Sequence, residues 1–176
     1  EILKDHKQEF LDIKKKANGK KILIATSTGG MLSSSHIESL LAFALTFYGA
    51  KVEILLCDKV LPACMIATSN FINENEMSKN GISKTCQSCL DNGKFAFQDL
   101  GLKIHYYSNF LKSNQLKKID RITDDLSLNE MMIYKEDKIS IGEHALAGAL
   151  RYYAVGDITN QKNNVDILRK FLKAGI

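Results

Sequence analysis

Apolar and polar residues along this chain form two kinds of pattern, short continuous apolar runs and longer stretches with helical spacing. Residues 20–27 (KKILIATS), 51–58 (KVEILLCD) and 101–108 (GLKIHYYS) are runs of the length typical of buried strands. Helical spacing follows the first run and precedes the third. Strands alternating with helices predict βαβ units with right-handed crossovers. The predicted fold class is therefore α/β, Rossmann-like, with a mainly parallel sheet flanked by helices.

The helix between the first two runs is expected over residues 35–48, and Gly49 ends it. Ser35 and Glu38 have the S-x-x-E spacing of a capping box, which predicts a helix start at Ser35. A second S-x-x-E, Ser140 with Glu143, predicts the start of a late helix through HALAGALRYYAVG. The helix at 35–48 has one apolar face, made of Ile37, Leu40, Leu41, Ala44, Leu45 and Tyr48.

Four further regions have weaker patterns. A leading helix is expected within residues 1–19, where Ile2, Leu3, His6, Phe10 and Ile13 have helical spacing among lysines. Packing on the domain is the simpler interpretation of that helix, and binding to a membrane surface is the alternative. Other helices are expected at 85–100 and from 165 to an end at Gly175. One is expected in the polar region 59–81, and one or two are expected in 112–138.

Length and composition predict the number of domains, the cellular location and the kind of partner. The 176 residues, 45% of them hydrophobic, suffice for one core, so we expect a single domain over 1–176. The first residue is not Met, so we expect this domain to be the N-terminal part of a longer protein. No apolar run could span a bilayer and EILKDHKQEF has no signal-peptide core, which predicts a cytoplasmic protein. The net charge of +4, without basic residues interleaved with aromatics, argues against nucleic acid as a partner.

The cysteines are the first candidate site. Cys57 closes the second predicted strand, Cys64 follows in the next loop, and Cys86 and Cys89 begin the helix before the third strand. Loops leaving parallel strands and the crossover helices after them start at the same sheet edge, so the four thiols can meet there. Zinc or an iron–sulfur cluster would suit four thiolates. Cysteines packed as small hydrophobes, or a redox or sulfur-carrying pair at Cys86 and Cys89, are the alternatives.

The loop TGGMLSSS after the first strand is the second candidate site. Gly29 and Gly30 allow close approach of the backbone, and the helix that starts near His36 directs its amide groups to the same place. Such a loop suits a phosphate, a carboxylate or a sugar hydroxyl. It matches neither G-x-G-x-x-G nor a P-loop, so a tight turn without a ligand is the alternative. His36 either faces the cleft or is a surface histidine.

The late helix is the third candidate site. His144, Gly148 and Arg151 lie on neighbouring turns, and a glycine between two long polar side chains leaves a shallow recess. Arg151 could hold an anionic group there, with His144 or Glu143 as candidates for proton transfer. The alternative is a solvated helix face on which Gly148 only allows close packing.

Taken together, KKILIATSTGG, the following helix, GAKVEILLCDKVLPAC, the C-x2-C pair and GEHALAGALRYYAVGD resemble the N-terminal half of bacterial surface or capsular polysaccharide glycosyltransferases of the two-Rossmann-domain type. The resemblance covers most of residues 20–157. It implies an acceptor-side domain in which Gly29, Gly30 and His36 line the acceptor side of a cleft and Arg151 approaches it. The acceptor would be a sugar or glycolipid, and the nucleotide-sugar donor would need a second Rossmann-like domain or a partner chain.

Two other interpretations compete with this one. The strand, loop and helix pattern is also similar to DsrE-like sulfur-relay proteins, which work through a loop cysteine, here Cys64 or Cys86. Residues 112–176 exceed what that compact fold needs. The cysteines by themselves would also fit a non-catalytic module that binds a metal or an iron–sulfur cluster.

Overall fold

The structure is a computed structural model that describes residues 6–26 and 28–176. The chain divides into two compact units, Glu1–Asp58 with Cys86–Phe110 and Lys59–Thr85 with Leu111–Ile176. The expected single domain over 1–176 stays a prediction. Within the described residues no helix is long and apolar enough to cross a bilayer.

The first unit contains a three-stranded parallel sheet of order β1-β2-β3. Its strands are β1 (Lys21–Thr26), β2 (Lys51–Leu56) and β3 (Lys103–Tyr106). Lys21 is the register partner of Lys51, and Glu53 is the partner of Lys103. Each strand lies inside one of the three predicted apolar runs, and the parallel α/β class is confirmed.

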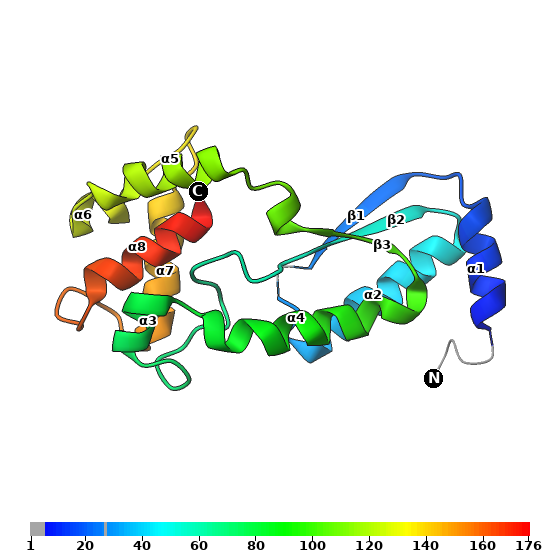
Figure 1. The fold of residues 1–176 in the computed structure, drawn as a ribbon, viewed down its shortest axis with the longest axis horizontal. Coiled ribbons are helices and arrows are strands. Elements are labelled where there is room, and N and C mark those ends of the chain that lie inside the picture. Colours follow the sequence, from blue (N-terminus) through cyan, green and yellow to red (C-terminus); the bar gives the residue numbers. More distant parts are fainter. Residues whose placement is uncertain (1–5, 27) are drawn as a thin grey trace. The chain divides into compact units, whose positions relative to one another are not determined.

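Three helices of the first unit cover one face of this sheet. They are α1 (Lys7–Lys16), α2 (Leu32–Phe47) and most of α4 (Ser83–Phe97), which continues into the 3-10 turn η1 (Gln98–Leu100). Figure 1 shows α2 and α4 on the same side of the strands. The leading helix is confirmed at Lys7–Lys16, whereas the expected Ile2 and Leu3 lie outside the described residues.

The core of the first unit lies between that sheet face and the helices. Strand side chains alternate between faces, so Ile24, Val52 and Ile54 point to the helices while Leu23 and Glu53 point to the other face. Ala42 and Phe97 meet them from α2 and α4, respectively. The buried cluster consists of Phe10, Ile24, Ala42, Val52, Ile54, Phe97, Leu100 and Leu102.

The predicted start of α2 is wrong by three residues. The helix begins at Leu32, and its N-cap, Met31, makes no side-chain cap bond. Ser35 is buried inside the first turns, where its Oγ donates to the Gly29 carbonyl at 3.4 Å. The Glu38 carboxylate accepts a hydrogen bond from the Oγ1 of Thr26 at 2.7 Å. Ser35 and Glu38 therefore join α2 to β1 and to its loop, and they form no capping box.

Most of the apolar face predicted on α2 points away from the sheet, although Leu45 packs against the core. Ile37, Leu40, Leu41 and Tyr48 are exposed, whereas Ser35, Ala42 and Thr46 are the residues that α2 buries. Small side chains on the inner side let the helix lie close to β1 and β2, and the Thr46 hydroxyl is satisfied by the Ala42 carbonyl at 2.8 Å. The spacing identified the residues that share a face but not the direction of that face.

The second unit is helical. Its elements are α3 (Glu74–Asn80), α5 (Ser113–Asp124), α6 (Leu128–Met132), α7 (Ile141–Tyr153) and α8 (Asn164–Gly175). One helix in 59–81 and two in 112–138 agree with the predictions, as does the end of the last helix at Gly175. The unit packs α7 against α8 around Ala145, Ala149, Tyr152, Ile167, Leu168, Phe171 and Leu172, all of which are buried.

The second predicted capping box is also wrong. Ser140 is the N-cap of α7, as expected, but its side chain makes no cap bond. The Gly142 amide, one of those that a cap would satisfy, instead donates to the Tyr134 carbonyl at 2.8 Å. An S-x-x-E that the sequence analysis did not use, Ser127 with Glu130, does form a capping box at the start of α6.

The face of the sheet opposite the helices has a charged cluster. The Nε2 atom of His105 lies 2.5 Å from an Oε2 of Glu53, and Lys103 Nζ lies 4.0 Å from the other carboxylate oxygen. Chiefly because of the hydrogen bond to His105, and despite partial desolvation, the pKa of Glu53 is lowered from 4.5. Cross-strand pairing of β2 with β3 thus includes an ionic contact.

Replacing His105 with Ala should raise the pKa of Glu53 toward its ordinary value, because the hydrogen bond that favours the carboxylate is lost. A 13C NMR titration of the Glu53 carboxyl measures this shift, and Lys103→Ala, which removes a smaller contribution, should raise it less. Since the folded state lowers this pKa, the stabilisation is present above the ordinary pKa and is lost as the pH falls through the lowered one. An unchanged Glu53 pKa in His105→Ala would contradict the assignment.

Candidate functional site

The predicted site residues fall in two places. Gly29, Gly30, His36, Cys57, Cys86 and Cys89 belong to the first unit, around the carboxyl ends of the strands and the helices that start there. Cys64, Glu143, His144 and Arg151 belong to the second unit, on α7 and the loop beside it.

The loop between β1 and α2 is in close contact with α4. A Cβ atom on Gly29 would lie 2.7 Å from the Cα of Gly93 and would overlap the Cys89 carbonyl oxygen. Real Cβ atoms do not approach backbone so closely, so only glycine fits at position 29. The close approach that this glycine permits is therefore made to a helix of the same unit. A role for Gly29 in binding a ligand stays a prediction.

The same loop is tied to α4 by a hydrogen bond to sulfur. The Gly30 amide donates to the Sγ of Cys89 at 3.0 Å. One thiol of the C-x2-C pair thus lies directly beside the glycine loop, at the carboxyl edge of the sheet, where the predicted topology places it. His36 lies one turn further along α2 with its side chain exposed.

The loops after β2 and β3 meet at the same edge, which the sequence analysis did not identify. Asp58 accepts a hydrogen bond from the Ser108 amide at 3.1 Å and another from the Ser108 hydroxyl. Burial, and then the charge of Cys57, raises the pKa of Tyr107. Asp58 and Ser108 both come within two residues of a strand end, a signal that could have found them. Their bonds hold the two loops together at the rim.

The four cysteines are the residues for which the sequence predicts a metal site. All four lie in the described part of the chain, and none is in a disulfide. Cys86 is buried in α4, and the other three are partly buried. Among the described residues no group of three or more His, Cys, Asp or Glu side chains is placed to hold a metal ion. Since Cys64 belongs to the second unit and the other three cysteines belong to the first, zinc or an iron–sulfur cluster at Cys57, Cys64, Cys86 and Cys89 stays a prediction.

The second unit has an open recess of about 450 Å³ beside α7. His144, Gly148 and Arg151 line it together, as does Cys64 from the loop before α3. Glu143 is exposed in the first turn of α7 and is not among the lining residues. The rest of the lining is apolar, from Leu61, Ala63, Met65, Ala145, Ala147, Phe171 and Ala174, with Gly175 at the end of α8.

Arg151 connects α7 to the loop before α3 at this recess. Its guanidinium donates to the Met65 carbonyl and, at 3.2 Å, to the Cys64 carbonyl. These bonds tie the loop to α7 and use two of the five N–H donors of the side chain. The three other donors leave Arg151 able to bind an anion as well. Cys64 is in a loop whereas Cys86 is in a helix, so of the two candidate sulfur carriers only Cys64 has the expected setting.

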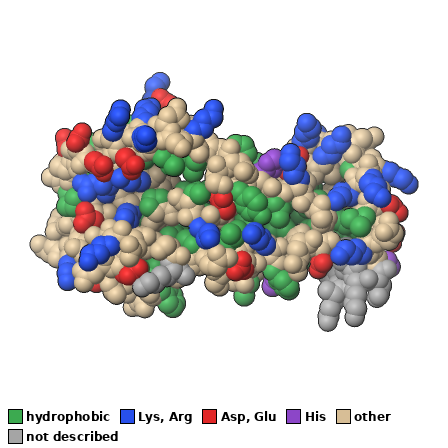
Figure 2. Space-filling view, in the orientation of Figure 1, with side chains coloured by type: hydrophobic (Ala, Val, Ile, Leu, Met, Phe, Trp, Pro, Cys, Tyr) green, Lys and Arg blue, Asp and Glu red, His purple; other side chains and the backbone are tan. Residues whose placement is uncertain are grey.

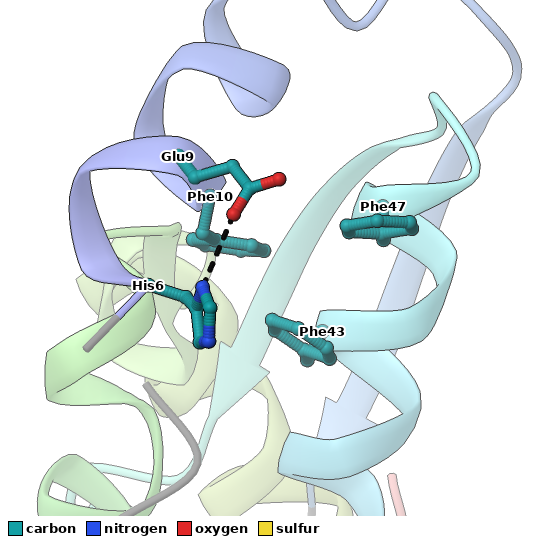
Figure 3. Close-up of a pocket in the computed structure, with 5 residues that line it drawn as sticks. All are labelled: His6, Glu9, Phe10, Phe43 and Phe47. Atoms are coloured by element: carbon teal, nitrogen blue, oxygen red, sulfur yellow. Dashed lines mark hydrogen bonds and ion pairs between the residues drawn. The ribbon is translucent and has the colours of Figure 1, made fainter. Parts of the chain in front are cut away.

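Another hollow, of about 350 Å³, lies between α1 and α2 and was missed by the sequence analysis (Figure 3). The rings of Phe10 and Phe43 stack with centroids 5.1 Å apart, and Phe47 follows at 6.1 Å from Phe43. His6 and Glu9 pair at the rim at 3.2 Å. Phenylalanines four apart on α2, together with Phe10 on the leading helix, were the signal that could have found it. The hollow suits an apolar ring better than a charged group.

Comparison with known proteins finds no relative of this chain, because no family model, no curated protein and no solved structure matches it. Function is therefore inferred from the residues of the chain itself.

Gly148→Ala should destabilise the second unit by about 1–3 kcal/mol, because the new methyl group would lie 2.5 Å from the Phe171 ring and would push α7 from α8. Gly156→Ala is the matched control, since a Cβ at Gly156 meets nothing within 4 Å. Thermal and urea unfolding measure both variants. Equal stability of the two would show that Gly148 is not needed for close packing of the helices.

Proposed function

We propose that this chain is the acceptor-side domain of a glycosyltransferase-like protein of surface polysaccharide biosynthesis. In open parallel sheets, ligands bind outside the carboxyl ends of the strands. The observation that carries the proposal is the loop after β1, which Gly29 and the Gly30–Cys89 hydrogen bond hold at that edge, directly before α2. The acceptor would be a sugar or a glycolipid, bound in the cytoplasm.

The distribution of charge favours a sugar acceptor over a nucleotide at this edge. Residues 28–37, the loop and the start of α2, contain hydroxyl and amide groups but no Lys or Arg. The strands instead begin with Lys21, Lys51 and Lys103, so these cations lie at the opposite edge. Figure 2 shows Lys and Arg side chains gathered over α1 and the amino ends of the strands. A diphosphate needs cations or dense amide donors, whereas sugar hydroxyls are satisfied by neutral groups.

The nucleotide-sugar donor would be held chiefly by a second Rossmann-like domain or a partner chain. The chain by itself is therefore not expected to transfer a sugar. Its own contribution is to position an acceptor hydroxyl at the carboxyl edge, where the loop backbone, Ser33 and Ser34 offer hydrogen-bond partners.

NMR titration of the chain with methyl and octyl glycosides, kept below the micellar concentration, tests the proposal. The amide resonances of residues 28–36 should shift with these acceptor analogues and should stay in place with a nucleoside diphosphate. Ser34→Lys, which puts a long charged side chain into the site, should weaken glycoside binding at least tenfold, whereas Lys20→Ala at the opposite edge should not. A loop that responds to the nucleoside diphosphate and not to glycosides would contradict the acceptor assignment.

A further inference from the structure

Helix α2 exposes an apolar surface, the outer face of α2, made of Ile37, Leu40, Leu41, Ala44, Phe47 and Tyr48. The five large residues among them are between 49% and 89% exposed. The helix buries the opposite side, with Ser35, Ala42 and Thr46. A helix in a globular domain normally places its large apolar residues against the core. Phe43 and Leu45 of α2 do pack there, but the five large residues of the outer face do not, so this face needs a partner.

The outer face carries no charge. Residues 31–49 contain no Lys, Arg or Asp, and their one acidic residue, Glu38, is partly buried and bound to Thr26. Helices that lie on an anionic membrane have Lys or Arg beside the apolar stripe, which α2 lacks. A charged partner protein would also find nothing complementary here. An uncharged face can meet its own copy without repulsion.

The spacing of the outer face suits packing against another helix. Ile37, Leu40, Ala44 and Phe47 follow the three-and-four alternation of a helix–helix seam, flanked by Leu41 and Tyr48. Ala44, near the middle, would let two helix backbones come close. At its end the seam continues through Phe47 into the hollow between α1 and α2 (Figure 3), which a partner side chain could enter.

The area is also sufficient. Aromatic side chains bury about 150–250 Å² each when fully covered, and aliphatic ones bury less. Because the five large residues are between half and nine-tenths exposed, the outer face offers on the order of 600 Å², and two copies would bury roughly 1,200 Å² together. Specific protein interfaces begin at about this size. We propose that the outer face of α2 is the interface of a homodimer, in which α2 packs on α2 of a second copy about a twofold axis.

Sedimentation equilibrium at micromolar concentrations tests the proposal. The wild-type chain should approach twice its mass of 19.7 kDa. Leu40→Glu should weaken the association at least a hundredfold, because a twofold axis brings two like charges together on one apolar seam. Phe95→Glu is the matched control: it adds the same charge at an exposed apolar residue of α4 and should leave the dimer intact. Circular dichroism should show both variants folded, as both positions face solvent.

A charge-swap experiment distinguishes self-association from other uses of the face. Leu40→Lys should be monomeric like Leu40→Glu, and an equimolar mixture of the two should form a heterodimer. A wild-type chain that stays monomeric, a dimer that Leu40→Glu leaves intact, or a mixture that fails to associate would each overturn the proposal. Binding of the monomer to phosphatidylglycerol vesicles that Leu40→Glu abolishes would overturn it in favour of a membrane surface.

Discussion

The contact between Gly29 and α4 is the constraint on which the sheet edge depends. The loop leaving β1 passes so close to Cys89 and Gly93 that no side chain fits at position 29. With the backbones in contact, the Gly30 amide reaches the Cys89 sulfur, and the chain turns directly into α2 at Leu32. The start of α2, the position of α4 and the shape of the proposed acceptor site all follow from one residue without a Cβ atom.

Covering the sheet from one side explains the surface of the first unit. The helices α1, α2 and α4 bury Ile24, Val52 and Ile54 on one face of the sheet. The other face can therefore carry the Glu53–His105 pair. The small inner residues of α2 let the helix lie close to the strands. Phe43 and Leu45 also pack against the core, and the other large apolar residues of the helix are exposed. That division assigns two different tasks to one helix, since its N-terminus borders the rim and its outer face offers an interface.

The local sequence pattern predicted the helices and strands of this fold well, but it did not predict which of their faces are buried or which tertiary contacts they make. The three apolar runs were correctly predicted to be strands, because run length and β-branched content can be read directly from the local sequence. The periodicity of α2 showed which residues share a face, yet the burial of that face depends on neighbours far along the chain. Three S-x-x-E motifs have the same local signal, but only Ser127 with Glu130 forms a capping box. At the first of the other two, Glu38 accepts a hydrogen bond from Thr26 instead, and at the second the Gly142 amide donates to the Tyr134 carbonyl. Topology likewise brought Cys89 to the glycine loop, as the shared sheet edge predicted, whereas a metal site formed by all four thiols stays a prediction.

The contact between Gly29 and α4 is tested most directly by the free energy of unfolding of Gly29→Ala, measured from the urea unfolding transition of the first unit. Because the methyl group would collide with backbone atoms that cannot rotate aside, the variant should lose at least about 2 kcal/mol and should shift the Cys89 and Gly93 amide resonances. A change within about 0.5 kcal/mol, the range of an ordinary surface substitution, would show that the loop and α4 are not in contact.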